Sequence, residues 1–536
     1  MKLNIKILLV CIILLAAFLR LYKLDQIPPT ISWDEAAVGY NGYTIANWGK
    51  DEWGNTFPLT FTSFRDDKHP VHVYFTALSV KFLGLSDFST RFPSALFGVL
   101  NVVVAFYLAR RFFSNNLVGL ASALFLAISP YSIQFSRFNH EANFALFFWM
   151  FGLLLFLKGF KEQKLFLPIA FISFGISLYS YHASLVVVFP LVIILTVFYF
   201  HDLLKTGKYF IVAIILFAIF TLIMFSNSAL LGTARISQTS IAKDKIVKTS
   251  LYQRTSNEIL GRIEVTFNQY LLHLSPQYLF LTGGANKKFS TQVVGEFYPI
   301  DFPLLVIGFL GLLWGVISRS VRWKIFLVLL GWAVLAPIPA SLVEEAPHPA
   351  RALFMMGSWN IIAAFGFYLV ASVYKKISFK IIVSGIVLMI LLAFFYNYLM
   401  DYYKNYANKY SIDWQYGMKQ IVEYSKDHNG YFQVYTTDIR FQPYIFFLYY
   451  LKTPLPEFLE TVAYNETKSK DYSLVTFFDK YHFGDWDPIE SMPNPGVLYA
   501  VTSSQYDGLR HKDLFDVKKR IKYLDGSDAF FIVSYP

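Results

Sequence analysis

Cysteine is almost absent from this chain of 536 residues, and its one example, Cys11, cannot form a disulfide within the chain. Charged residues are also scarce, at 15% of the total, whereas an ordinary soluble domain carries about a quarter. The chain has no low-complexity segment and no internal period of the kind that a solenoid requires. These absences exclude a disulfide-stabilised scaffold, an ordinary soluble enzyme and a repeat array.

Apolar and aromatic residues dominate instead, at 55% and 19% of the chain. Such a composition is typical of a polytopic membrane protein whose aromatic side chains form belts at the lipid–water interface. The net charge of +11 would suggest a nucleic-acid partner in a soluble protein. In a membrane protein the positions of the basic residues offer a simpler explanation.

About eleven apolar runs approach the roughly 20 residues that a membrane-spanning helix needs. The first has a basic start, Lys2 and Lys6, and is expected to be an uncleaved signal anchor, because many further runs follow it. The runs lie at 4–22, 91–110, 117–136, 142–157, 165–181, 183–200, 209–228, 302–318, 324–341, 352–373 and 380–398.

Basic residues gather in alternate gaps between these runs, which predicts that the N-terminus is inside. The inner gaps then hold Arg110 and Arg111; Lys158, Lys161 and Lys164; Lys205 and Lys208; Arg319, Arg322 and Lys324; and Lys375, Lys376 and Lys380. This arrangement explains much of the positive charge without nucleic acid, and it places the C-terminal residues outside.

The composition changes after the last run, where a helix-like stretch (414–424), strand-like runs (431–437, 497–502, 529–534) and turns alternate. We therefore expect an all-α polytopic membrane domain over residues 1–398 and a small extracytoplasmic soluble α/β domain over 399–536. Two long outer loops, 23–90 and 229–301, interrupt the membrane domain, and each has the spacing of an amphipathic helix at the membrane surface.

The first outer loop carries two carboxylates, Asp34 and Glu35, directly after Trp33. Ser32 and Glu35 fit a capping box, so both acids can simply stabilise the first turn of a helix that continues past Tyr40. A capped first turn is also a rigid mount for a catalytic carboxylate. Tyr40 can simply anchor this helix at the lipid–water interface.

A second polar cluster, Asp66-Asp67-Lys68-His69-Pro70, precedes a helix that Pro70 can open and that should end near Gly84. It can be a solvated turn. Alternatively, Lys68 at a helix start can meet a phosphate, and the aspartate pair can hold a divalent cation through its oxygens.

Two outer edges of the predicted spans also carry charge. Arg137, His140 and Glu141 lie between two runs, and His348 and Arg351 lie before another. Helix capping and interfacial snorkelling explain the first group, and a proline-kinked turn explains the second. Arg351 nevertheless opposes the positive-inside trend, and an arginine fork suits phosphate oxygens.

Ionisable residues thus cluster at the outer ends of the spans and hardly occur in their middles. A transporter usually carries charge in mid-membrane, whereas an enzyme acting on a lipid-linked headgroup needs it at the edge. The pattern favours the enzyme. A flippase of lipid-linked sugars and a non-catalytic scaffold stay open as alternatives.

Taken in order, five elements of the chain resemble the GT-C-type membrane glycosyltransferases, in the group of the protein O-mannosyltransferases and the lipid A aminoarabinose transferase. They are Trp33-Asp34-Glu35-Ala36, Asp67-Lys68-His69-Pro70, the run from Ser89 to Phe112, Arg137 to Glu141, and His348 to Leu353. The resemblance covers about residues 1–400 and is firmest over 30–160.

The resemblance implies a GT-C fold in the cytoplasmic membrane and a polyprenyl-phosphate sugar as donor, presented at the outer face. Asp34, with Glu35 beside it, would be the catalytic site, and Asp34 would deprotonate an acceptor hydroxyl whose attack inverts the anomeric carbon. The substrate-binding residues would be Tyr40, Asp67, Lys68, Arg137, His140, Glu141, His348 and Arg351. Lys68 and Arg351 would stabilise the leaving phosphate.

No cofactor and no metal are implied, although Asp66-Asp67 keeps a divalent cation open. The acceptor can be a protein, a lipid or a glycan, and no nucleic acid is expected. Three departures from the family pattern, Ala37 for arginine, His69 for proline and Glu141 for aspartate, leave the sugar and the acceptor open.

Overall fold

The computed structural model describes residues 4–64, 66–232, 239–373, 376–438, 442–465, 474–486, 490 and 492–536. The chain forms two compact units. We call Met1–Tyr22 with Ser94–Asp401 the helical unit, and Lys23–Pro93 with Tyr402–Pro536 the mixed unit. The first long loop therefore clusters with the C-terminal residues, whereas the sequence prediction assigns it to the membrane domain.

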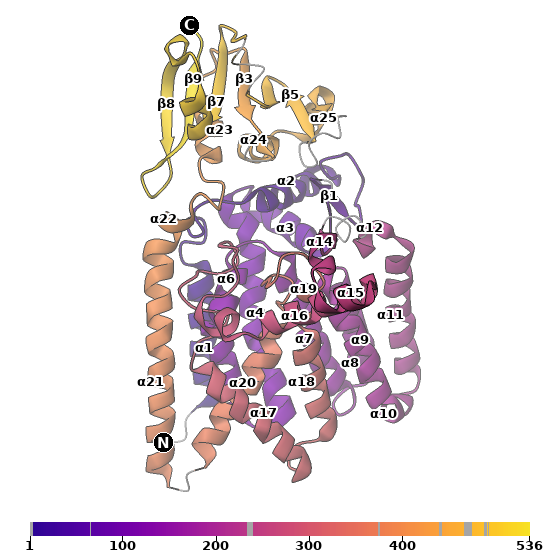
Figure 1. Ribbon diagram of the computed structural model, residues 1–536. Helices are drawn as coiled ribbons and strands as arrows, with labels where there is room; N and C mark the ends of the chain where they lie inside the picture. Colours follow the sequence, from indigo (N-terminus) through magenta and orange to yellow (C-terminus); the bar gives the residue numbers. More distant parts are fainter. Residues whose placement is uncertain are drawn as a thin grey trace. The chain divides into compact units, whose positions relative to one another are not determined.

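Every predicted apolar run lies in one or two helices of the helical unit (Figure 1). These are α1 (Ile5–Leu21), α4 (Asp87–Phe113), α5 (Asn116–Ile128), α6 (Pro130–Ser136), α7 (Glu141–Gly159), α8 (Phe166–Leu178), α9 (Ala183–Phe198), α11 (Lys208–Ser226), α17 (Asp301–Ile317), α18 (Trp323–Leu335), α19 (Ile338–Ser341), α20 (Met355–Ser372) and α21 (Ile377–Asp401).

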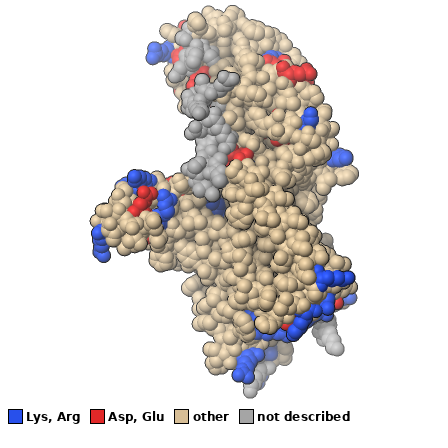
Figure 2. Space-filling view, turned by 90° about the vertical axis from the view of Figure 1, so that its right-hand side faces the viewer, with Lys and Arg blue, Asp and Glu red and all other residues tan. Residues whose placement is uncertain are grey.

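Six helices among the described residues are long and apolar enough to cross a membrane, or seven if the bent pair α5 and α6 is one span. The helices α8, α9 and α17 are apolar but shorter. The predicted count of about eleven spans therefore stays a prediction. On the face drawn in Figure 2, Lys and Arg side chains gather at the lower end of the helical unit, and the band above carries almost none.

Two spans are broken, and each break has a local cause. The axes of α5 and α6 differ by 59°, because Pro130 lacks an N–H at the start of α6, where Ser129 caps the new helix. In α20, Met356 and Gly357 leave helical geometry, and Gly357 has a φ of +86°. Such a φ favours glycine.

Short helices complete the helical unit: α10 (Phe200–Leu204), α12 (Ser228–Leu231), α14 (Lys243–Val247), α15 (Ser250–Thr255), α16 (Glu258–His273) and the π-helix η1 (Gln277–Leu281). The predicted amphipathic helix of the second outer loop is α16. Its apolar side chains are exposed, including Ile259 at 70% and Phe267 at 59%. This apolar face suits the membrane surface.

The mixed unit begins with α2 (Trp33–Trp48), a hairpin of β1 (Phe61–Ser63) and β2 (Asp66–Lys68), and α3 (Pro70–Leu83), which ends at Gly84 as predicted. After residue 401 it contains η2 (Tyr402–Tyr406), α22 (Ala407–Tyr410), α23 (Met418–Asp427), β3 (Gln433–Thr437), α24 (Pro443–Leu451), α25 (Leu455–Thr461), β4 (Ala463–Tyr464), β5 (Val475–Phe478), β6 (Tyr481–Gly484), β7 (Val497–Thr502), α27 (Ser503–Gly508), η3 (Lys512–Leu514), β8 (Asp516–Lys522) and β9 (Asp528–Ser534).

Seven of these strands form one sheet in the order β4-β5-β6-β3-β7-β9-β8. Strand β3 is parallel to β6 and β7, and the other neighbours are antiparallel. Both faces of β7 are covered, with Leu498 in one apolar cluster and Val497 in another, which is why its sequence is uniformly apolar. The three strands predicted from the sequence are β3, β7 and β9, whereas the helix predicted at 414–424 begins only at Met418.

Helix α2 is a core element of the mixed unit and not the surface helix that the spacing suggests. Its residues Ala36, Ala37 and Tyr40 are buried in the apolar cluster that also contains α24 and one face of the sheet. The glycine at position 39 allows a close approach, because a Cβ there would meet the Tyr449 ring at 2.4 Å. The first turn of α2 is therefore held rigidly.

Candidate functional site

The first turn of α2 carries the capping box that the sequence predicts. The Ser32 hydroxyl accepts a hydrogen bond from the Glu35 backbone N–H at 3.3 Å. The Glu35 carboxylate in turn accepts one from the Ser32 N–H at 3.0 Å. These two bonds fix the direction in which the neighbouring side chain, Asp34, leaves the helix.

Glu35 itself is sealed inside the mixed unit. Arg91 donates to it from Nε at 2.9 Å and from Nη2 at 3.2 Å, and both side chains are at most 1% exposed. The remaining guanidinium donors bind the carbonyls of Leu24, Pro28 and Thr30. The pair thus fastens the start of the first loop to the start of α4. Glu35, predicted as catalytic, has the surroundings of a positioning residue.

Asp34 is the opposite case, since its side chain is 51% exposed. The Trp33 indole N–H donates to Asp34 Oδ2 at 2.9 Å, and Lys68 Nζ donates to Oδ1 at 2.5 Å. Lys68 is only 8% exposed. A half-exposed carboxylate is thereby oriented by two donors while part of it faces outward, which is the geometry that a general base needs.

Lys68 reaches Asp34 because of the hairpin that ends beside α3. In that hairpin Thr62 pairs with Asp67, and the Thr62 hydroxyl donates to Asp67 Oδ1 at 2.7 Å. This contact gives Asp67 a role in holding the hairpin. The two predicted elements, Asp34-Glu35 and Asp67-Lys68, are therefore brought together although 31 residues separate them.

Glu52 is an acidic residue near this site that the sequence does not identify as a candidate. Glu52 is 1% exposed and accepts a hydrogen bond from the Ser63 hydroxyl at 3.3 Å. Its pKa is raised to about 8, first by burial and then by the charge of Asp51, although hydrogen bonds with Asn41 and Ser63 and the charge of Lys68 act in the opposite direction. The available signal is the Asp51-Glu52 pair itself, but such a pair in a polar loop usually indicates a solvated turn.

Tyr40 lies away from any surface. Its hydroxyl donates to the Thr453 carbonyl at 3.0 Å, and its ring packs edge-on against Phe458. It is 0% exposed, so the ring has no free face for a sugar. Tyr40 is a core residue, and we leave it out of the site proposed below.

The remaining predicted residues belong to the helical unit. Arg137 is 0% exposed and donates to the carbonyls of Leu19 and Tyr22, both at 2.8 Å. These contacts fasten the end of α6 to the end of α1, so its surroundings favour a structural role. His140 caps α7 through Nδ1, which accepts from the Ala142 N–H at 3.2 Å. Glu141, in the first turn of α7, is 7% exposed.

His348 and Arg351 share a turn that contacts α16. The His348 N–H donates to His273 Nε2 at 3.0 Å, and the Arg351 N–H donates to His348 Nδ1 at 3.3 Å. Burial lowers the pKa of His273 to about 4, so its imidazole is neutral at pH 7. Arg351 also donates to the Thr239 hydroxyl at 3.3 Å.

A cavity of about 350 Å³ opens beside this turn. Its wall is mainly aliphatic, with Leu185, Val186 and Leu342 among its members, and Arg351, Arg262 and His182 add basic groups. An apolar cavity with a few cationic side chains can hold a lipid chain and its phosphate. Among the residues that the structure describes, no group of three or more His, Cys, Asp or Glu side chains could hold a metal ion.

Several solved structures have a similar fold. ArnT from Cupriavidus metallidurans in the apo state superposes with a TM-score of 0.57 at 13% identity, over 98% of this chain and 97% of that one. The same protein bound to undecaprenyl phosphate gives a TM-score of 0.55 at 13% identity, over 98% and 97%. The oligosaccharyltransferase AglB from Archaeoglobus fulgidus, in complex with an inhibitory peptide and a dolichol-phosphate, gives 0.53 at 16% identity, over 84% and 64%.

The chain thus has the fold of the GT-C glycosyltransferases, as its motifs predict, and it is a multi-pass membrane protein. Residues 67–225 match the family described as dolichyl-phosphate-mannose-protein mannosyltransferase. The chain spans 64% of the length of AglB, so the activity of that whole protein is not carried over. No curated protein matches the sequence.

Proposed function

We propose that this protein is an inverting glycosyltransferase that moves a sugar from a polyprenyl-phosphate donor to an acceptor hydroxyl at the outer face of the cytoplasmic membrane. The observation that carries the proposal is the contrast between two adjacent acids. Glu35 is sealed against Arg91, whereas Asp34 is half exposed and oriented by Trp33 and Lys68. The buried carboxylate of Glu35 thus helps to hold the first turn of α2 in the position from which the Asp34 carboxylate faces outward.

In this mechanism Asp34 accepts the proton of the acceptor hydroxyl while the oxygen attacks the anomeric carbon. The bond from that carbon to the phosphate oxygen breaks, its electrons leave with polyprenyl phosphate, and the configuration at the carbon inverts. The charge that grows on the phosphate needs cations, which stabilise a transition state by roughly 3–4 kcal/mol each when well placed. Lys68 and Arg351 are the candidates.

The donor site that we propose is the aliphatic cavity beside Arg351. Its apolar wall suits the first isoprene units of a polyprenyl chain, and Arg351, Arg262 and His182 suit the phosphate. The undecaprenyl phosphate complex of ArnT and the dolichol-phosphate complex of AglB support a ligand of this class for the shared fold. The sugar and the acceptor are the subject of the experiment.

The test uses purified protein in liposomes with a panel of polyprenyl-phosphate sugars, following release of polyprenyl phosphate. We expect one donor to be turned over, and Asp34→Asn to reduce the rate by about a hundredfold or more, since general-base catalysis contributes 10²–10⁴-fold. Asp25→Asn is the matched control, because Asp25 is an exposed acid on the same loop, and it should act like the wild type. Equal rates for Asp34→Asn and wild type would remove Asp34 from the mechanism. Lipid flipping without release would favour the transporter alternative.

A further inference from the structure

A second and larger cavity lies in the helical unit and contains none of the residues of the proposed sugar-transfer site. Its volume is about 660 Å³, within the range of small-molecule sites. It forms where the ends of α4 and α7 meet the start of α18 and the side of α20. These helix ends carry the basic gaps that the positive-inside pattern assigns to the inner face of the membrane.

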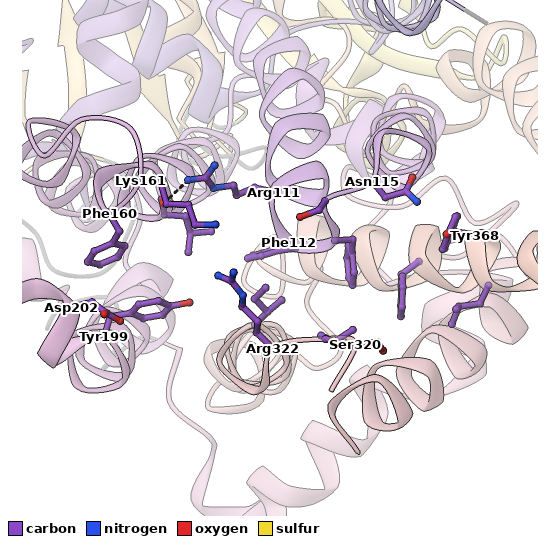
Figure 3. A pocket seen from close by; sticks show the side chains of 17 residues that line it. Arg111, Phe112, Asn115, Phe160, Lys161, Tyr199, Asp202, Ser320, Arg322 and Tyr368 are labelled. Atoms are coloured by element: carbon purple, nitrogen blue, oxygen red, sulfur yellow. Dashed lines mark hydrogen bonds between the residues drawn. The ribbon is translucent and has the colours of Figure 1, made fainter. Parts of the chain in front are cut away.

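The polar part of this cavity is cationic. Arg111, Lys161 and Arg322 line it, and Figure 3 shows their charged ends pointing into the same part of the cavity. One lining carboxylate, Asp202, is offset by Lys324, whose Nζ lies 3.2 Å from its Oδ2. Arg111 is offset by Glu162 at 3.1 Å. The cavity therefore keeps a surplus of positive charge.

That surplus resides on Lys161 and Arg322. Within the described part of the chain, neither side chain has a carboxylate at salt-bridge distance, and both are exposed. An arginine and a lysine that converge on a cavity without acidic partners are suited to a phosphate, the arginine by its planar fork and the lysine as a point charge. Exposure also means that neither is needed to complete the core.

The rest of the wall is apolar. Phe113 and Phe365 stack with centroids 4.2 Å apart, and Phe160 and Leu369 add further apolar surface. A free phosphate ion or a soluble nucleotide gains little from such a wall, whereas an acyl chain gains by burial. The combination of basic and apolar walls at the end of membrane helices matches the headgroup of an anionic phospholipid and the start of its chains.

We propose that this cavity binds an anionic phospholipid, with the phosphate held by Lys161, Arg322 and Arg111 and an acyl chain along the phenylalanine wall. The site is separate from the sugar-transfer site, so its occupancy does not depend on the proposed function. Bound lipid would tie the ends of α4, α7, α18 and α20 together.

The experiment is native mass spectrometry of the full-length protein exchanged into phosphatidylcholine, with dioleoyl phosphatidylglycerol added at increasing concentration. We expect saturable binding of phosphatidylglycerol to the wild type. The double variant Lys161→Gln, Arg322→Gln should bind about 30-fold more weakly, because each basic residue near an anionic headgroup contributes about a factor of five. Circular dichroism should show unchanged helix content, since both side chains are exposed.

The matched control is Lys205→Gln, Lys208→Gln, which removes the same charge from the same predicted face outside the cavity. It should bind as the wild type does. Equal weakening in both double variants would overturn the proposal in favour of diffuse attraction. Equal binding by wild type and the Lys161, Arg322 variant would also overturn it, as would complete competition by inorganic phosphate or glycerol 3-phosphate, which would identify a soluble anion as the ligand.

Discussion

Asp34 and Glu35 are neighbours in sequence with opposite surroundings, and this difference predicts that replacing each of them has a different effect on activity and on stability. Glu35 is 0% exposed and paired with Arg91. Removing one partner of such a pair leaves a buried charge uncompensated, at a typical cost of about 3–5 kcal/mol. Asp34 is half exposed, where an ion pair contributes about 0–1 kcal/mol.

We therefore expect Glu35→Ala to lower the free energy of unfolding by about 3–5 kcal/mol, and Asp34→Asn to change it by less than about 1 kcal/mol. Thermal unfolding of both variants in the same detergent, followed by tryptophan fluorescence, measures the difference. A Glu35→Ala protein with wild-type stability and no activity would instead assign Glu35 to the chemistry.

Glu52 provides a pH-dependent test, since its pKa is raised to about 8 from 4.5, first by burial and then by Asp51. A carboxyl whose pKa is higher in the folded state binds more protons when folded, so its contribution to stability falls as pH rises. The fall runs from about pH 4.5 to about pH 8 and reaches at most about 1.4 kcal/mol per pH unit.

Glu52→Gln removes that titration while keeping the shape of the side chain. The difference in stability between this variant and the wild type should grow in favour of the variant between pH 5 and pH 8. Denaturant unfolding at several pH values measures it, and subtracting the wild-type curve removes the other titrating groups. A difference independent of pH would show that Glu52 titrates normally.

At the scale of single elements, the break in α20 depends on one glycine. Gly357 has a φ of +86°, and a Cβ there would lie 2.6 Å from the Trp332 ring. We expect Gly357→Ala to destabilise the protein by about 2 kcal/mol or more, through backbone strain and overpacking. Gly385 in α21 is the control, since a Cβ there meets nothing within 4 Å. A thermal shift that is equal in both variants would mean that the break tolerates a side chain.

The sequence predicts the elements far better than their breaks and their roles. Apolar runs identify the helices because lipid requires long apolar segments, but the 59° bend between α5 and α6 depends on Ser129 and Pro130 in three dimensions. Helix α2 shows the same limit. Its spacing suggests a surface helix, yet α24, about 400 residues further on, covers it.

The sequence likewise predicts only part of the candidate site. The motifs identify Asp34 and Lys68, and the structure brings them into contact. Sequence alone does not separate Asp34 from Glu35, because the separating factor is Arg91, 56 residues away from Glu35. Nor does it reveal that Tyr40 and Arg137 are buried, since aromatic and basic residues in an outer loop are usually exposed.

At the scale of the whole molecule, the distribution of basic residues and the number of membrane spans constrain each other. The basic gaps place the N-terminus inside, and a C-terminal domain outside then requires an odd number of spans. Each apolar run lies in a helix, but by length and composition six or seven of these helices qualify as spans. An independent measurement of sidedness therefore tests whether the number of crossings on either side of α11 agrees with the prediction.

Because Cys11 is the only cysteine, Cys11→Ser provides a background in which single new cysteines report their own side. We expect a membrane-impermeant maleimide to label Lys522→Cys, in the exposed strand β8, on intact cells. Lys208→Cys, at the start of α11, should be labelled only after the membrane is opened, since it lies in a predicted inner gap. Labelling of both sites on intact cells would mean that the number of crossings between them is even and not odd, as the apolar runs predict. Labelling of Lys208→Cys alone would reverse the orientation, and it would move the proposed sugar-transfer site to the inner face, where a donor presented outside could not reach Asp34.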